Sequence, residues 1–158
     1  MSETINQNIT VKELDELRLV GFRVLCSGDQ YIVEIQKASS KLSKRIDEIK
    51  QVMNPREQFG ASMVENETAE EDGYWVCVEV KDFEDIPSDM VTLTIPAQRY
   101  AVIAYHGPNH QIMDAYHDLH QWIGENSYVR RKNTWHIEKY HDWRDAEDLD
   151  VELFDTIG

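Results

Sequence analysis

The order of the predicted strands and helices constrains this chain most, because the same order occurs in both halves. In each half, small and β-branched residues that predict a strand lead into a turn, and apolar residues at helical three- or four-residue spacing follow. Two further strands come after each helix. In chain order, the predicted elements are a strand over residues 11–25, a helix over 31–53, strands over 59–64 and 74–80, a strand-rich stretch over 91–106, a helix that carries Ile112, Ala115, Tyr116, Leu119 and Ile123, and strands over 135–140 and 151–157.

This repeat predicts an α+β fold, with the order β-α-β-β in residues 8–82 and again in residues 89–158. The two halves share negligible sequence identity, so the tandem repeat rests on element order alone. A chain of 158 residues is long enough to bury a stable core without a disulfide or a structural metal. We therefore expect a single domain over residues 1–158.

The charge composition limits the partners of the chain. Sixteen Lys and Arg against 30 Asp and Glu give a formal net charge of −14, which repels nucleic-acid backbones and anionic membranes. Direct nucleic-acid binding is therefore not expected. No apolar run reaches the length of a membrane span, and the N-terminus has no basic and apolar signal segment. These features favour a cytoplasmic protein that does not contact a membrane.

The sequence contains no motif for a cofactor or a metal. Cys26 and Cys77 stand alone in apolar segments and are expected to be buried, reduced thiols. His110, Asp114 and His117 share one side of a predicted helix, but no further ligand accompanies them, so a solvated polar face is expected. No phosphate-binding glycine loop, nucleophile elbow or dinucleotide fingerprint occurs.

A carboxylate in the predicted strand over residues 135–140 is the first candidate for function. Side chains alternate along a strand, so His136, Glu138 and Tyr140 share one face. A carboxylate among aromatic rings loses hydration, and its charged form then needs a cation, a hydrogen-bond donor or a proton. Glu138 therefore suits a cationic ligand or proton transfer. The alternative is a solvated glutamate on an exposed strand face.

The strand over residues 74–80 provides an aromatic candidate. Val76 and Val78 share the face that suits cover by a helix, which leaves Trp75 on the opposite face. A flat ring beside a carboxylate stacks on planar aromatics and favours cations by roughly 0.5–2 kcal/mol. We therefore expect Trp75 to line a cleft with Glu138, on the face away from the helix. A tryptophan that only packs the sheet is the alternative, and a register shift of one residue would move Glu138 to the helix-covered face.

Three segments carry a resemblance to a known family through their order: residues 96–102 (Pro-Ala-Gln-Arg-Tyr-Ala-Val), 106–108 (His-Gly-Pro) and 138–140 (Glu-Lys-Tyr). Together they resemble the GyrI-like or AraC-type effector-binding domains, over most of the chain. The resemblance implies two pseudo-symmetric β-α-β-β units whose antiparallel sheets join, with helices on one side and a ligand cleft between the halves. It also implies that Glu138 corresponds to the acid that lies at the bottom of that cleft in multidrug-sensing members.

The resemblance leaves two functions open for such a cleft. The leading prediction is a stand-alone protein that binds amphiphilic, often cationic, aromatic compounds through Glu138, Trp75, Tyr140 and His136. The alternative is a hydrolase of cyclopropane-containing alkylating agents. In that case Glu138 orients or deprotonates water, and Tyr140 stabilises the developing oxyanion.

A third function class needs a protein partner and no cleft. Gyrase-inhibiting members imply that acidic segments, here residues 65–72 and 142–150, mimic the charge of DNA against a basic protein surface. Clustering of these two segments on one side of the molecule would favour this reading. Transcription factors of the family carry a helix-turn-helix segment, whereas this chain begins almost directly with its first predicted strand, so regulation by direct DNA contact is not expected.

Overall fold

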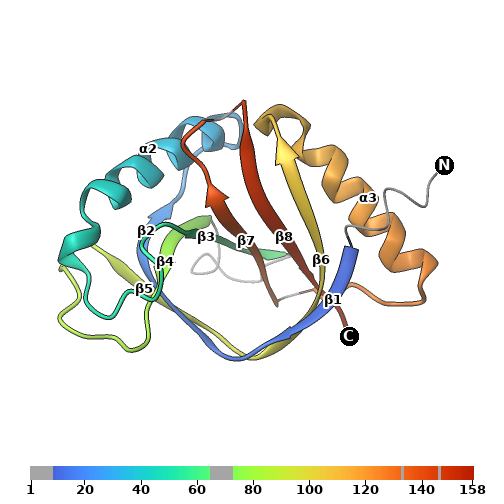
Figure 1. The fold of residues 1–158 in the computed structure, drawn as a ribbon, viewed down its shortest axis with the longest axis horizontal. Coiled ribbons are helices and arrows are strands. Elements are labelled where there is room, and N and C mark those ends of the chain that lie inside the picture. Colours follow the sequence, from blue (N-terminus) through green and yellow to red (C-terminus); the bar gives the residue numbers. More distant parts are fainter. Residues whose placement is uncertain (1–8, 65–72, 133, 146) are drawn as a thin grey trace.

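The computed structural model of the chain describes residues 9–64, 73–132, 134–145 and 147–158 (Figure 1). The described residues form an eight-stranded antiparallel sheet and two α-helices, which confirms the predicted α+β class. No helix in these ranges is long and apolar enough to cross a membrane. The strands are β1 Ile9–Leu14, β2 Leu17–Val24, β3 Gln58–Val64, β4 Tyr74–Glu79, β5 Val91–Ile95, β6 Gln98–Gly107, β7 Thr134–Asp142 and β8 Leu149–Thr156; the helices are α2 Tyr31–Lys44 and α3 Ile112–Glu125, with 3-10 turns at Gly28–Gln30, Ile46–Glu48 and Asn109–Gln111.

The two halves of the chain join into one sheet with the strand order β1-β6-β8-β7-β3-β4-β2-β5. β3 and β7 pair at the centre, and the strands on either side of this pair follow in corresponding order. The first strand of each half is exchanged, because β1 pairs with β6 and β5 pairs with β2. This arrangement is the pseudo-symmetric joined sheet that the resemblance implies.

The prediction of one strand over residues 11–25 is wrong, because two separate strands occupy this stretch. The exposed residues Asp15 and Glu16 interrupt it, and the chain then crosses from one end of the sheet to the other. The strand-rich stretch over residues 91–106 is divided in the same way, at Pro96, which lacks the N–H that a continuing ladder needs.

Helix α2 ends earlier than the predicted end at residue 53. The N–H of Arg45 donates to the carbonyl of Leu42 at 3.1 Å, which closes the last turn as a 3-10 turn. The Arg45 guanidinium then donates to Glu48 at 2.8 Å and to Asp89 at 2.5 Å. Asp89 lies far along the chain, so the contact that fixes this turn leaves no local periodic signal. Ile49 still packs against the core, which explains the helical spacing.

Both helices cover the same face of the sheet, as the resemblance implies (Figure 1). Helix α2 packs over β2 and β4 through a core that contains Leu42 and Val78. Helix α3 packs over β6 and β8 through a second core that contains Leu119 and Leu153. The opposite face carries a third core, formed by Leu17, Leu19, Phe59, Ala61, Trp75, Cys77, Ile95, Tyr100, Val102, Ile137 and Phe154.

A buried carboxylate ties α3 to the sheet. Asp155 of β8 is fully buried, and its Oδ1 lies 2.5 Å from His136 Nδ1 of β7. Its Oδ2 lies 2.8 Å from His120 Nε2 of α3 and 2.7 Å from Arg130 Nε, which follows that helix. Burial alone would raise the pKa of Asp155, but the two histidines and the arginine lower it well below its usual range.

Asp155 is expected to make the fold sensitive to acid. A carboxyl whose pKa is lower in the folded than in the unfolded state stabilises the fold above its unfolded pKa, about 3.9, and this contribution is lost as the pH falls through the folded value. Asp155→Asn should therefore be less stable by roughly 3 kcal/mol at pH 7, and its free energy of unfolding should fall less steeply below pH 4. Urea titrations at several pH values test this; parallel curves would contradict it.

Gly21 is expected to be irreplaceable in β2 for a steric reason. A Cβ at this position would lie 2.0 Å from the carbonyl oxygen of Val76 on β4, which is backbone and cannot move aside. Gly21→Ala should lower the free energy of unfolding by about 3 kcal/mol. Gly124→Ala in α3 is the matched control, because a Cβ there meets nothing within 4 Å and alanine should stabilise the helix by up to about 1 kcal/mol. Equal effects of both changes in urea unfolding would contradict the packing.

Candidate functional site

Glu138 lies near the centre of the sheet, on the face that the helices cover, so the expectation that it lies on the face away from the helices is wrong. It pairs with Gly60 of β3 on one side and with Leu153 of β8 on the other. Leu153 belongs to the core under α3, whereas Val76, which pairs with Gly60, belongs to the core under α2. Glu138 therefore projects into the space between the two helices, where the two halves of the chain meet.

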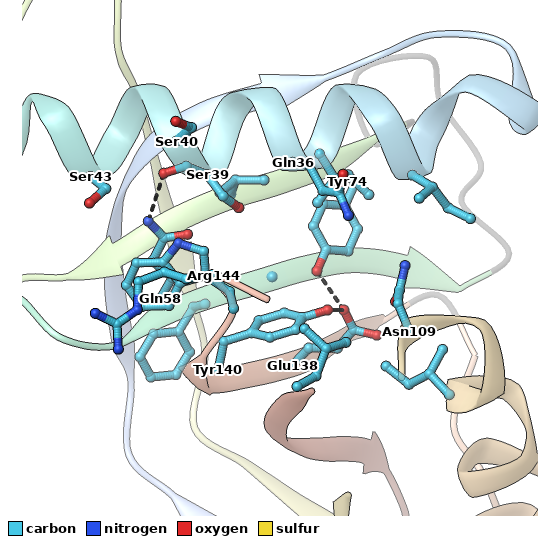
Figure 2. A pocket seen from close by; sticks show the side chains of 18 of the residues that line it. Gln36, Ser39, Ser40, Ser43, Gln58, Tyr74, Asn109, Glu138, Tyr140 and Arg144 are labelled. Carbon is cyan, nitrogen blue, oxygen red and sulfur yellow. Dashed lines mark hydrogen bonds between the residues drawn. The ribbon is translucent and has the colours of Figure 1, made fainter. Parts of the chain in front are cut away.

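A cavity of about 500 Å³ includes Glu138 in its wall (Figure 2). This volume is in the range of small-molecule sites. Both halves contribute to the lining, through α2, β3 and β4 on one side and β7 with the turn before α3 on the other. Apolar surface comes from Ile32, Ile35, Val76, Ile112 and Trp143.

Three tyrosine hydroxyls donate to the Glu138 carboxylate. Tyr74 of β4 donates to Oε1 at 2.5 Å, and Tyr140 of β7 donates to the same oxygen at 2.9 Å. Tyr116 of α3 donates to Oε2. The donors come from three different elements and from both halves, so the carboxylate is in place only when the whole sheet and α3 have assembled.

The tyrosines are held in their protonated form. Burial, followed by the negative charge of Glu138, raises the pKa of Tyr74, Tyr116 and Tyr140 well above its usual value of about 10. At neutral pH these hydroxyls therefore remain hydrogen-bond donors to the carboxylate. They add no charge to the site.

Gly60 makes room for this arrangement. A Cβ on Gly60 would lie 1.6 Å from the hydroxyl oxygen of Tyr74, so any other residue would displace the ring that reaches across β3 to Glu138. Glycine in the interior of a strand often marks such a close approach. The pairing of Gly60 with Glu138 thus explains how a tyrosine two strands away contacts the carboxylate.

Among the described residues, no charged group compensates the Glu138 carboxylate. No lysine, arginine or histidine in the described part of the chain forms an ion pair with it. Its three partners are neutral hydroxyls, and Oε2 accepts only one of them. A carboxylate has about four acceptor positions, so Oε2 has capacity for another donor. The cavity therefore contains a half-buried negative charge with room for a positive group.

The predicted position of Trp75 is wrong. Trp75 pairs with Ala61 and lies in the core on the opposite face of the sheet, with 5% of its surface exposed. Its ring meets Trp135 edge to face at 5.0 Å, and the guanidinium of Arg23 lies 4.9 Å above it. Strand alternation correctly separated Trp75 from Val76, but the cavity opens on the Val76 face, between the helices, because the other face is filled by its own core.

Of the other predicted site residues, one lines the cavity and one does not. Tyr140 lines the cavity beside Glu138, where strand alternation put it. His136 lies on the same face of β7 but is buried against Asp155, and it is not among the residues that line the cavity. His106, near the end of β6, lies 2.7 Å from Asp148 at an exposed position, away from Glu138 and outside the cavity lining. In the described ranges, no group of three or more His, Cys, Asp or Glu has an arrangement that could hold a metal ion.

Tyr74 and Gly60 escaped the sequence analysis, although a signal for one of them was present. Alternation along β4 puts Tyr74 on the same face as Val76 and Val78, which is the face that bears the cavity. The role of Gly60 depends on a ring two strands away and leaves no local signal. Cys26 and Cys77 are free, as expected; Cys77 is buried, whereas Cys26 is only half-buried.

Comparison with solved structures shows the fold in other proteins. SAV2435 bound to tetraphenylphosphonium is 16% identical with a TM-score of 0.72, and the match covers 95% of this chain and 93% of that chain. The C-terminal domain of EcmrR is 17% identical with a TM-score of 0.68 over 95% and 96% of the two chains. A hydrolase from Listeria innocua is 10% identical with a TM-score of 0.54 over 96% and 92%.

A longer EcmrR chain, seen in a complex with DNA, is 20% identical with a TM-score of 0.67. The match covers 94% of this chain but 56% of that one, so this chain spans little more than half its length. No curated protein matches the sequence. The family model of the GyrI-like small molecule binding domain matches residues 7–154. Because this match covers almost the whole chain, the protein belongs to the GyrI-like small molecule binding domain family.

Proposed function

We propose that this protein binds amphiphilic aromatic cations in the cavity between its helices, with Glu138 as the group that attracts the cation. The observation that carries the proposal is the carboxylate itself, which accepts three neutral hydroxyls and forms no ion pair with a cation of the described residues. A positive charge 4 Å away would be attracted by about 4 kcal/mol at an effective dielectric constant of about 20.

The walls of the cavity suit the apolar part of such a ligand. Ile35 and Ile112 face it from the two halves, and the rings of Tyr140 and Trp143 add flat surface. Rings of this kind stack on planar aromatics without a strict demand on shape. SAV2435, which shares the fold, has been seen with the aromatic cation tetraphenylphosphonium, and this supports the same ligand class here.

Hydrolysis of a reactive cyclopropane is the second candidate, favoured by the shared fold of the Listeria innocua hydrolase. Glu138 would orient or deprotonate water, with Tyr140 as a donor to the developing oxyanion. The tyrosines weaken this candidate, because the Tyr140 hydroxyl already donates to Oε1 of Glu138, together with that of Tyr74, and is not free to donate to an oxyanion. The geometry therefore favours binding over turnover.

Binding to nucleic acid or to a protein is less well supported. The formal charge of −14 opposes direct contact with nucleic acid, and a cytoplasmic location remains the expectation from the sequence. The acidic-surface hypothesis depends on two segments, of which residues 65–72 lie outside the described residues. The structure thus adds support to the cavity and none to a protein partner.

The change Glu138→Gln tests the proposal directly. It keeps the shape of the side chain and a hydrogen-bond acceptor but removes the charge, so tetraphenylphosphonium should bind at least about tenfold more weakly in isothermal titration calorimetry. Glu79→Gln is the matched control, because Glu79 lies on β4 on the opposite face of the sheet and should leave the affinity unchanged. Unchanged affinity in Glu138→Gln would exclude the carboxylate as the cation site.

The same two proteins separate binding from hydrolysis. A cyclopropane-containing alkylating agent, incubated with wild type and with Glu138→Gln, is analysed by mass spectrometry. A binding protein leaves the compound intact in both mixtures. A water adduct that forms only with the wild type would instead establish the hydrolase.

A further inference from the structure

A buried amide at the other end of the cavity carries information about the ligand. Gln58, at the start of β3, lines the cavity and is only 3% exposed. Its Nε2 donates to the carbonyl oxygen of Ser39 on α2 at 3.0 Å. Its Oε1 is buried and accepts no hydrogen bond from any described residue. Because the Ser39 carbonyl can only accept, the amide nitrogen has to face α2, and the oxygen is left as an acceptor without a donor.

An unsatisfied buried acceptor is unusual and costly. Most buried polar side-chain atoms in folded proteins have a partner, and a missing one destabilises the fold. The Gln58 side chain takes no part in the hydrogen bonds that the three tyrosines donate to Glu138. A donor supplied by a bound ligand would remove the cost.

The strand register places Gln58 and Glu138 on the same face of two neighbouring strands. Gln58 pairs with Tyr140, and Gly60, two residues further along β3, pairs with Glu138. Two residues of a strand span about 7 Å. Figure 2 shows Tyr140 lying between Gln58 and Glu138, and the ring reaches toward the carboxylate, to which its hydroxyl donates at 2.9 Å. Both polar groups therefore face the same cavity, on either side of the Tyr140 ring.

We propose that the cavity prefers aromatic cations that also carry an amide N–H donor on the ring. The cation lies at Glu138, the ring lies over Tyr140, and the amide N–H donates to Gln58 Oε1. Arg144 also lines the cavity. Among the described residues its exposed guanidinium bonds only Asp142, at 3.3 Å, so it is available to the carbonyl of the same amide. This inference deepens the proposed function and depends on it.

Two ligands that differ in one group test the inference on the wild-type protein. 4-(Trimethylammoniomethyl)benzamide has the donor, whereas 4-(trimethylammoniomethyl)acetophenone has the same shape and carbonyl with a methyl in place of NH₂. In isothermal titration calorimetry, the benzamide should bind at least about fivefold more tightly, the lower bound for satisfying a buried acceptor. Equal affinities would overturn the inference.

Variants then assign the preference to one residue. Gln58→Met keeps the length of the side chain but removes the acceptor, and it should abolish the difference between the two ligands. Gln36→Met is the matched control, since Gln36 also lines the cavity but is exposed, and the preference should persist there. Persistence of the preference in Gln58→Met would overturn the inference.

Tetraphenylphosphonium, which has no amide, separates failure of the inference from failure of the proposed function. If it binds the wild type while the benzamide shows no advantage over the acetophenone, the amide preference is wrong and cation binding stands. If none of the three cations binds, both proposals are wrong.

Discussion

A negative charge held between two helices by neutral hydroxyls is the constraint on which this structure depends. Glu138 projects from the centre of the sheet, and its donors come from β4, α3 and β7. Tyrosine donors stabilise the charged carboxylate without cancelling its charge, which a lysine or arginine would do. Gly60 keeps the space above β3 open so that one of these donors can reach the site. The remaining acceptor capacity of Oε2 and the raised pKa values of the tyrosines both follow from this arrangement.

Asp155 shows the contrasting solution on the same face of the sheet. Its carboxylate is fully buried, and an arginine and two histidines surround it. Such a group is matched by its own protein and contributes to the attachment of α3, so it has no need of a ligand. His136 belongs to this cluster although it is only two residues from Glu138 on β7. Two neighbouring positions on one face of β7 therefore have different roles. His136 helps to bind a carboxylate that charged groups of the protein compensate, whereas Glu138 is a carboxylate that only neutral hydroxyls contact.

The sequence predicted the order of the elements, because that order depends on local patterns, but it put Glu138 on the face away from the helices, whereas the structure puts it on the helix-covered face. Strand and helix periodicities located the β-α-β-β units, and alternation put Glu138 and Tyr140 on one face. What failed depends on contacts between distant segments. The end of α2 is fixed by Arg45 with Asp89, which no periodicity records. Trp75 was wrongly assigned to the cavity. Alternation shows which residues share a face of β4, but it does not show on which face of the sheet the cavity lies. Gly60 acts on a ring two strands away.

The exchange of β1 and β5 makes the two halves inseparable. Ile9 pairs with Ile103, so the first strand finds its neighbour only after most of the chain has been synthesised, and the sheet of the first half is completed by a strand that follows it. Each half on its own would expose an unpaired strand edge, which promotes aggregation. Pairings this distant in sequence also slow folding. A cut between the halves, however flexible the linker there, would therefore yield two fragments that cannot close their own sheets, and the binding cavity exists only in the intact chain.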